Sequence, residues 1–263
     1  MSEPIHIPTV AELNGKGQPV EVLFWVGCAG SFDERAQKIT KAMAKILHHL
    51  NVNFAILGKE ESCTGDPAKR AGNEFLFQMQ AMNNIAIMNG YGITKIITTC
   101  PHCFNTLKNE YPSLGGNYDV VHHTTYLQGL INDGKLTFGK GDYKGKKITY
   151  HDSCYIGRAN GIYDAPRDVL KKLDAELVEL KRCRAKGMCC GAGGAQIFKE
   201  AEKGDKEVNV DRAEEALETK ADVIAANCPF CMTMLRDGVK HFNKEDEVEV
   251  LDLAELVANA NDL

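Results

Sequence analysis

The sequence predicts an α/β fold in two related lobes, each a small, mostly parallel sheet flanked by helices. Two observations predict this fold. Short apolar runs such as KIITT at 95–99 alternate with longer amphipathic stretches such as DERAQKITKAMAKILHHL at 33–50, which is typical of strand–helix units around a parallel sheet. The cysteine spacing also repeats along the chain, because Cys28 to Cys63 and Cys154 to Cys189 are both 35 positions apart.

Each half of the chain closes in the same way. The motif Cys-Pro-x-Cys follows an apolar run in both halves, KIITTC at 95–100 and DVIAANC at 222–228. The first cysteine of each half also follows such a run, and a predicted strand leading into a helix ends each half. Because the polar, glycine-rich segment at 132–147 separates the halves, we expect an N-terminal lobe at 1–135 and a C-terminal lobe at 146–263.

The composition describes an ordinary globular protein with a mildly acidic surface. A chain of 263 residues with 44% hydrophobic residues can bury a large core, and its formal net charge of -5 offers no basic cluster for nucleic acid. No basic stretch followed by an apolar run begins the chain, and no later stretch approaches about 18 apolar residues. We therefore expect a cytoplasmic protein without a membrane span, which reaches a membrane only through a partner subunit.

Ten cysteines in such a chain indicate metal or redox chemistry, because cytoplasmic reductants keep thiols from forming structural disulfides. The carboxyl ends of parallel strands meet at one crevice, where open α/β sheets bind ligands. Four cysteines follow predicted strands: Cys28, Cys100, Cys154 and Cys228. The Cys-x-x-Cys spacing lets Cys103 and Cys231 reach the same centre from the first turn of a helix, whose N–H groups and dipole favour thiolates.

The second half predicts an iron–sulfur site. It supplies five cysteines, whereas structural zinc needs only four ligands, and cysteine thiolates are the usual ligands of iron–sulfur clusters. Glycines after the vicinal pair, in the loop CCGAGG at 189–194, let the backbone approach closely and direct N–H groups at cluster sulfurs. The five candidate ligands are Cys154, Cys189, Cys190, Cys228 and Cys231.

The first half predicts a related site, but the sequence leaves open which metal group it holds. Its four candidate ligands are Cys28, Cys63, Cys100 and Cys103. Thr64 stands where the second half has the second cysteine of its vicinal pair. Four thiolates suit a cubane [4Fe-4S] cluster or a zinc ion, and a decayed site that now serves packing is the alternative. Cys183 lies outside the repeat and is left out of both sites.

Four polar features near the cysteines have simple structural interpretations. His102 lies between two candidate ligands and could donate a hydrogen bond to a cluster, but this position varies freely in the motif. His151 and Asp152 precede Cys154 and could relay protons or form a turn. Asp66 is expected to cap the N-terminus of a helix. The charged run at 202–220 is expected to be a solvated helix face.

These motifs resemble a known family. Two halves of the pattern Cys, Cys-Cys-Gly, Cys-x-x-Cys look like the cysteine-rich CCG domain of the B subunit of heterodisulfide reductase and of iron–sulfur subunits of related oxidising systems. Strings such as MCCGAGGAQIF and ANCPFCMTMLRDG resemble the branch linked to quinone reduction or electron-transferring flavoprotein. The resemblance implies a noncubane [4Fe-4S] cluster on the five cysteines of the second half. It departs at Thr64, so for the first half we expect a more ordinary cluster or none.

The expected function is that of an electron-transfer subunit of a larger oxidoreductase. The chain has no flavin or nicotinamide fingerprint, so partners must supply and accept the electrons. By resemblance these are a flavoprotein dehydrogenase or ferredoxin-like subunit and a membrane or quinone subunit. Three alternatives are open: a catalytic disulfide reductase that cleaves its substrate at the noncubane cluster, a zinc-stabilised binding module, and an iron–sulfur redox sensor.

Overall fold

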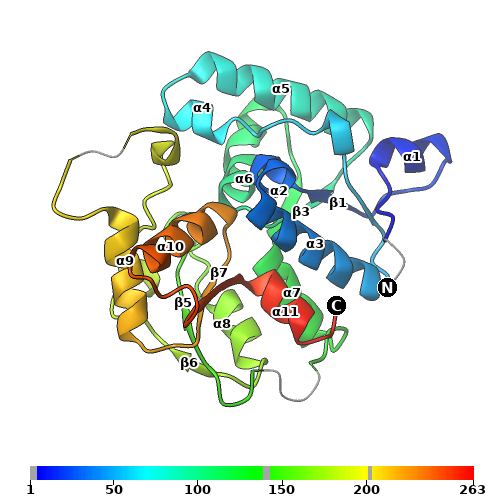
Figure 1. The fold of residues 1–263 in the computed structure, drawn as a ribbon. Helices are drawn as coiled ribbons and strands as arrows, with labels where there is room; N and C mark the ends of the chain where they lie inside the picture. Colours follow the sequence, from blue (N-terminus) through cyan, green and yellow to red (C-terminus); the bar gives the residue numbers. More distant parts are fainter. Residues whose placement is uncertain (1–4, 139–142, 201–202) are drawn as a thin grey trace.

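The computed structural model describes residues 5–138, 143–200 and 203–263, and within these ranges it forms two four-stranded parallel sheets (Figure 1). The first has the order β2-β1-β3-β4, from β1 (Val22–Trp25), β2 (Phe54–Ala55), β3 (Lys95–Thr98) and β4 (Asp119–His122). The second has the order β6-β5-β7-β8, from β5 (Lys147–Tyr150), β6 (Glu176–Val178), β7 (Val223–Ala226) and β8 (Glu249–Asp252). The matching orders confirm the predicted repeat of an α/β lobe.

Helices connect the strands of each sheet. The first lobe contains α1 (Val10–Gly15), α2 (Gly27–Phe32), α3 (Glu34–His49), α4 (Asp66–Arg70), α5 (Glu74–Gly90), α6 (Pro101–Asn105) and α7 (His123–Asn132). The second contains α8 (Asp164–Lys171), α9 (Val208–Glu218), α10 (Pro229–His241) and α11 (Leu253–Asn259). Short 3-10 helices occupy Gly58–Glu60, Tyr111–Leu114, Arg184–Lys186 and Gln196–Phe198, and a π-helix occupies Thr106–Glu110. Between the lobes, positions 139–142 of the predicted separating segment lie outside the described residues.

The long helix α3 illustrates how the local sequence forms these elements. Asp33 caps its N-terminus, since its Oδ1 accepts a hydrogen bond from the Ala36 N–H at 2.7 Å. Ile39, Met43 and Ile46 recur at spacings of three and four and are buried on one face, as an amphipathic helix requires. The edge strands β2 and β6 were not predicted, because two or three residues are too few to give a clear apolar pattern.

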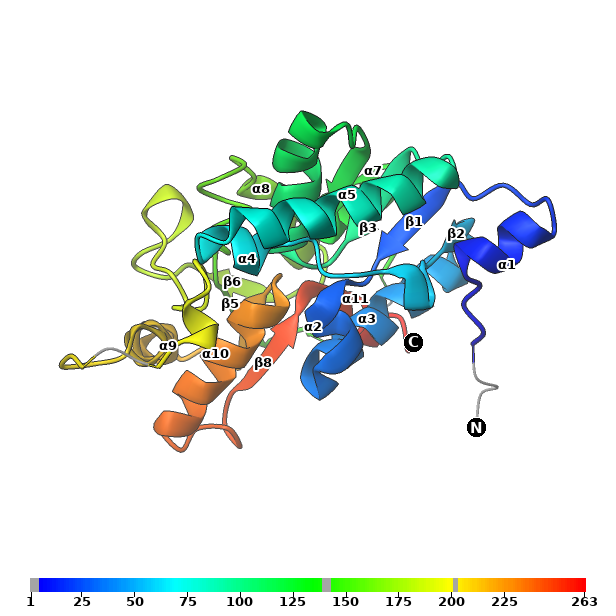
Figure 2. The same ribbon diagram turned by 90° about the horizontal axis from the view of Figure 1, so that it is seen from above.

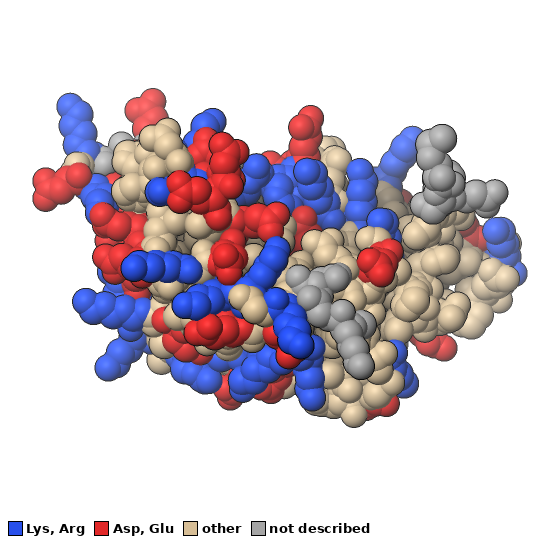
Figure 3. Space-filling model, turned by 60° about the horizontal axis from the view of Figure 1, so that its bottom comes forward, with Lys and Arg blue, Asp and Glu red and all other residues tan. Residues whose placement is uncertain are grey.

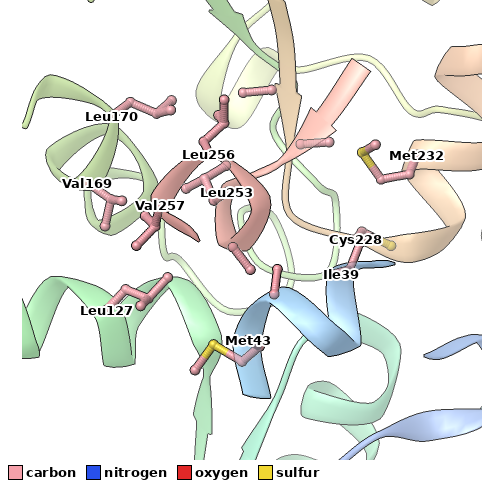
Figure 4. Packing of buried hydrophobic residues seen from close by; sticks show 14 of the residues in the cluster. Ile39, Met43, Leu127, Val169, Leu170, Cys228, Met232, Leu253, Leu256 and Val257 are labelled. Carbon is pink, nitrogen blue, oxygen red and sulfur yellow. The ribbon is translucent and has the colours of Figure 1, made fainter. Parts of the chain in front are cut away.

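The lobes pack against each other in a two-fold manner. Helix α3 of the first lobe packs on α11 of the second, and α7 of the first packs on α8 of the second. Helices α3 and α8 follow the first strand of their lobe while α7 and α11 end it, so the same pair of positions meets twice. Figure 4 shows side chains of all four helices in one apolar cluster, among them Ile39, Met43, Leu127, Val169, Leu253 and Leu256. This hydrophobic cluster therefore spans both lobes, and a second cluster of buried residues, which includes Trp25, lies mainly in the first lobe.

Polar contacts fix the orientation of this interface. His123 Nε2 lies 3.0 Å from Asp252 Oδ1, and both side chains are fully buried at the start of α7 and α11. Arg35 of α3 donates to both carboxylate oxygens of Glu255 in α11, at 2.7 and 2.6 Å. A bidentate arginine–carboxylate pair specifies one geometry. These contacts restrict the relative orientation of the two lobes more than apolar packing alone would.

The outer surface carries both signs of charge. In Figure 2, α9 and α10 of the second lobe lie at one end of the molecule and α1 of the first lobe at the other. On the face shown in Figure 3, lysine and arginine side chains are interspersed with aspartate and glutamate. Within the described ranges, every helix is too short or too polar to cross a bilayer.

The shared core predicts that a change in one lobe destabilises the other. Leu256 is fully buried in α11, and its replacement by alanine is expected to lower the free energy of unfolding by about 2–5 kcal/mol. Trp25, the single tryptophan, lies in the first lobe, so its fluorescence in a urea titration reports that lobe. The Leu256→Ala variant should shift the Trp25 transition together with the helical circular dichroism signal.

The matched control is Met79→Ala on the exposed part of α5, which should change the free energy of unfolding by less than about 0.5 kcal/mol. A Trp25 transition that stays at its wild-type urea concentration in Leu256→Ala would contradict a shared core.

Candidate metal centre

The structure brings nine of the ten cysteines to one region, where the carboxyl ends of the two sheets face each other. Within each lobe, thiols far apart in sequence are in hydrogen-bonding contact, as between Cys28 and Cys63 and between Cys154 and Cys189. Cys183 is the exception: burial and the nearby carboxylates of Glu179 and Asp152 raise its pKa, whereas neighbouring thiols shift the pKa of each of the other nine. The nine that converge are the nine candidate ligands of the sequence.

In the second lobe the five thiols form a connected series. Cys189 contacts Cys154 and Cys190, Cys190 also contacts Cys231, and Cys231 contacts Cys228. Cys228 occupies the N-cap position of α10 and Cys231 lies in its first turn, with the proline at the first helical position as helix starts favour. The Cys-Pro-x-Cys motif therefore places both cysteines at the start of one helix, as the spacing predicted.

The first lobe repeats this arrangement with four thiols. Cys100 occupies the N-cap position of α6, Cys103 follows in its first turn, and the two thiols are in contact. Cys28 lies at the start of α2, beside this pair: a Cβ atom on Gly27 would lie only 3.3 Å from Cys103 Sγ. Cys63 contacts Cys28 from the segment that precedes α4. The four candidate ligands of this lobe are thus close together.

The loops Cys63-Thr64-Gly65 and Cys189-Cys190-Gly191 have the same conformation. The N–H of each glycine lies close to the sulfur of its loop's first cysteine, at 3.4 Å for Cys63 and 3.3 Å for Cys189. Both glycines are left-handed, with φ of +88° and +95°, which side chains disfavour. The glycine of the repeated motif is therefore required by the turn that directs an N–H at a thiolate.

Thr64 takes the place of the fifth thiol. It is 2% exposed, and its Oγ1 lies 3.9 Å from Cys103 Sγ. Cys190 contacts Cys231, the equivalent cysteine, in the same way. The hydroxyl thus occupies the ligand position without offering a thiolate, and the first site keeps its shape while losing one donor.

The two sites touch each other. Cys100 of the first lobe is in hydrogen-bonding contact with Cys228 of the second, so the nine thiols form a group that crosses the lobe interface. The Cys-Pro-x-Cys thiols at this contact are between 1% and 5% exposed. The first two cysteines of each half are instead half-buried: Cys28, Cys63, Cys154 and Cys189. Each site therefore has an outer edge toward the surface and an inner edge against its twin.

Contacts with neighbouring thiols lower the pKa of the middle cysteine in each half, and in the first half they also lower that of Cys100. A hydrogen bond from Cys28 lowers the pKa of Cys63 to about 7, helped by the Gly65 N–H. Hydrogen bonds from Cys154 and Cys190, with that of the Gly191 N–H, lower the pKa of Cys189. The donating thiols have raised pKa values in turn. Because metals bind thiolates, this pattern prepares anionic ligands in both sites.

Glu61 is a polar residue of the site that the sequence analysis missed. Its carboxylate accepts hydrogen bonds from the N–H groups of Gly27 at 2.5 Å and Val26 at 3.1 Å. Burial raises its pKa to about 7, against these hydrogen bonds. Glu61 thereby ties the Cys63 segment to the backbone that carries Cys28. Its only sequence signal is its place two residues before a cysteine.

His102 and Asp66 form a buried pair beside the first site. His102 Nδ1 lies 3.0 Å from Asp66 Oδ2, and its ring stacks on Tyr155 of the other lobe with centroids 4.3 Å apart. Burial would lower the pKa of His102, but the hydrogen bond to Asp66 and the Cys100 thiolate outweigh it and raise the pKa. Asp66 does not cap α4 as expected. Gly65 holds the N-cap position, and the Asp66 side chain turns to His102 and Arg70.

His151 and Asp152 have separate roles before Cys154. The Asp152 carboxylate binds the Arg167 guanidinium at 2.8 and 2.9 Å and accepts from the Arg184 N–H, so it is held in a structural ion pair. His151 Nδ1 instead accepts from Arg212 Nε at 2.9 Å. Burial and the neighbouring Arg212 charge lower the pKa of His151 to about 3, so its ring is neutral.

The charged run at 202–220 is not simply a solvated helix face, as was expected. Its residue 202 lies outside the described residues, and α9 occupies most of the remainder. Arg212 is fully buried and Glu215 is 6% exposed, because α9 turns this side toward the metal centre. The pattern of charges alone does not distinguish a buried ion pair from an exposed one.

The donor set of this centre suits an iron–sulfur cluster. The thiols are soft ligands, and five of them in the second lobe exceed the four that a structural zinc ion takes. The sulfurs of such clusters accept hydrogen bonds from backbone N–H groups. Both glycine loops direct an N–H at a cysteine sulfur in this way. The residues present therefore fit the group that the sequence predicted.

Comparisons with known proteins agree with this assignment. The family model of the CCG cysteine-rich domain matches twice, at residues 22–108 and 148–236. The chain is 47% identical over 256 residues to a probable iron-sulfur-binding oxidoreductase FadF of Bacillus subtilis, covering 97% of this chain and 36% of the relative. It is 43% identical to an EtfAB:quinone oxidoreductase of Syntrophomonas wolfei, with 93% and 35% covered.

More distant relatives include one subunit of the dihydromethanophenazine:CoB--CoM heterodisulfide reductase of Methanosarcina barkeri, 34% identical over 91% of this chain and 59% of the relative. A solved structure, a hypothetical protein of Helicobacter pylori, shares the fold with a TM-score of 0.59 at 9% identity, covering 99% of this chain and 51% of that one. The chain spans between about a third and three fifths of the curated relatives named here. The three curated relatives are named as oxidoreductases or a reductase subunit, and one of them as iron-sulfur-binding. From the paired matches of the family model and the paired cysteine sites, the chain belongs to the CCG cysteine-rich domain family.

Proposed function

We propose that this chain is the iron–sulfur electron-transfer module of a larger oxidoreductase, carrying electrons between a flavin or ferredoxin-type donor and a quinone or thiol/disulfide acceptor. The observation that carries the proposal is the group of nine thiols that crosses the lobe interface through the contact of Cys100 with Cys228. A single metal site for structure would need neither two thiol groups nor their contact.

In this proposal each lobe holds one [4Fe-4S] cluster, which supplies a one-electron carrier when bound. The second lobe offers five thiols, and this number favours the noncubane type: Cys154, Cys189, Cys190, Cys228 and Cys231. The first lobe offers four thiols, which suits a cubane cluster: Cys28, Cys63, Cys100 and Cys103. The different donor numbers would give the two carriers different reduction potentials.

The burial pattern supports transfer through the molecule. The half-buried cysteines on the outer edge of each site, such as Cys63 and Cys189, face the side from which a redox partner could approach. The buried thiols at the inner edge exclude water between the sites. Electrons would enter at one outer edge, cross at Cys100 and Cys228, and leave at the other.

The names of the relatives support the choice of partners. One is named for an EtfAB:quinone activity, which favours a flavoprotein donor and a quinone acceptor for this chain as well. Another is named a probable membrane-anchored ferredoxin, which supports a location at the membrane through a partner or a further segment. The share of these relatives that the chain covers leaves room for such segments.

Metal content tests the proposal directly. After anaerobic purification, wild type should contain about eight irons and as many sulfides. Cys190→Ser and Cys63→Ser should each lose about four, because each removes a ligand of a different cluster. Iron and sulfide counts with EPR spectra make the measurement, and Cys183→Ser is the matched control that should keep the wild-type content.

Zinc without iron or sulfide would overturn the proposal and establish the zinc-stabilised module. Loss of iron in Cys190→Ser alone would restrict it to one cluster in the second lobe.

Restoring the fifth thiol of the first lobe is a second prediction. Thr64 occupies the position of Cys190 with a similar side-chain volume, so Thr64→Cys should fold and offer Cys103 a neighbouring thiolate. We expect the EPR signal of the first cluster to change toward that of the second. Thr64→Ser, which keeps a hydroxyl, should leave the signal unchanged, and identical spectra for both variants would contradict the equivalence of the two positions.

The disulfide reductase is the alternative that an activity assay separates. Since the first site lacks a fifth thiol at Thr64, we expect it to transfer electrons without cleaving a disulfide. The reduced, isolated chain should therefore pass electrons to a soluble quinone while leaving a small disulfide unreacted. Repeated turnover of the disulfide, measured as thiol released per protein, would favour the reductase instead.

A further inference from the structure

A buried histidine, His151, lies beside the thiols of the second site. His151 follows β5 and is 1% exposed. One of its ring nitrogens and the sulfurs of Cys190 and Cys231 all lie within 4.8 Å of one another. The histidine is thus close enough to act on a group held by these two thiols, either as a metal ligand or as a hydrogen-bond donor.

Arg212 decides between these two roles. An arginine Nε always carries a hydrogen and can only donate, so the Nδ1 atom that accepts from it at 2.9 Å must offer a lone pair. The hydrogen of the neutral ring is therefore on Nε2. Binding of a metal through Nε2 would move that hydrogen to Nδ1, where it would meet the N–H of Arg212. His151 is fixed as a donor.

The donor has no acceptor among the described residues. Nε2 of His151 is buried without a hydrogen-bond partner. A buried N–H that lacks a partner is costly, so such groups are rare and call for an acceptor. Nδ1 is already occupied, which leaves Nε2 as the ring atom free to meet whatever Cys190 and Cys231 hold.

The arginine is itself held in place. It is fully buried, and its Nη1 donates to the Arg182 carbonyl at 3.0 Å and to Glu215 Oε2 at 3.1 Å. Glu215 is anchored in turn by the backbone N–H of Arg182 at 2.5 Å. A hydrogen-bond network that extends from α9 therefore sets the orientation of the imidazole, and this network contains no thiol.

We propose that the Nε2–H of His151 donates a hydrogen bond to a sulfur of the cluster in the second lobe, with Arg212 as the positioning residue that fixes the tautomer. This inference rests on the proposed function, since it needs that cluster to be bound. A hydrogen bond to sulfur stabilises the additional negative charge of the reduced state, so His151 raises the reduction potential of the cluster.

The first lobe carries a comparable donor at the same position. Trp25 precedes Cys28 by three residues, as His151 precedes Cys154; Trp25 ends β1 and His151 directly follows β5. The Trp25 Nε1–H is also buried without a hydrogen-bond partner among the described residues. An aromatic ring N–H at this position is thus common to both lobes, and Trp25 provides a matched control in the same molecule.

The test uses the full chain with both sites loaded, prepared anaerobically with ¹⁵N-labelled histidine. Pulsed EPR is recorded in a redox state in which the second cluster is paramagnetic. We expect a weak ¹⁵N coupling, as from a nitrogen separated from the cluster by a hydrogen bond, together with an exchangeable proton coupling. Both should vanish in His151→Phe, whose cluster should also have a lower reduction potential, and both should persist in Trp25→Phe.

Three outcomes overturn the inference. A strong ¹⁵N coupling would make His151 an iron ligand. Absence of the coupling from iron-loaded wild type would refute the hydrogen bond while leaving the proposed function intact, and this measurement needs no variant to fold. Wild type that binds no iron would refute the inference together with the proposed function.

Discussion

The buried interface between the lobes is the constraint on which the metal centre depends. Each lobe presents its cysteines at the carboxyl end of its own sheet, as parallel strands dictate. That arrangement alone would give two independent sites. Because α3 packs on α11 and α7 on α8 in one apolar cluster, the two sheet ends face each other and Cys100 meets Cys228. The buried His123–Asp252 pair and the Arg35–Glu255 pair then fix the orientation.

The two lobes share the loop that the fold requires but differ in one ligand that the chemistry uses. The left-handed glycines Gly65 and Gly191 and their N–H contacts to cysteine sulfur are the same in both, so the loop geometry is shared. The side chain just before the glycine differs between the lobes, since Thr64 stands where the other lobe has Cys190. Keeping the turn while changing the ligand is a simple way to give two similar sites different electronic properties.

The surroundings of the two sites differ as much as their ligands do. The first site is bordered by Glu61 and by the Asp66–His102 pair, both of which bring charge or protons close to thiols. The second is bordered by a neutral imidazole oriented by a buried guanidinium. Hydrogen bonds and charges near the sulfurs tune reduction potential, so in the proposed function this asymmetry would favour one direction of electron flow between the lobes.

The sequence by itself determined the repeat, the main strands and helices, and the nine cysteines that converge, because these follow from local apolar patterns and from the spacing of one residue type. Only the tertiary structure decided that the two sites touch, that Asp66 binds His102 instead of capping α4, and that Arg212 is buried on a helix expected to be solvated. The physical reason is the distance along the chain over which each kind of interaction acts. Strand and helix formation depends on near neighbours in the chain, whereas the burial and pairing of a charged group depend on which distant surface folds over it.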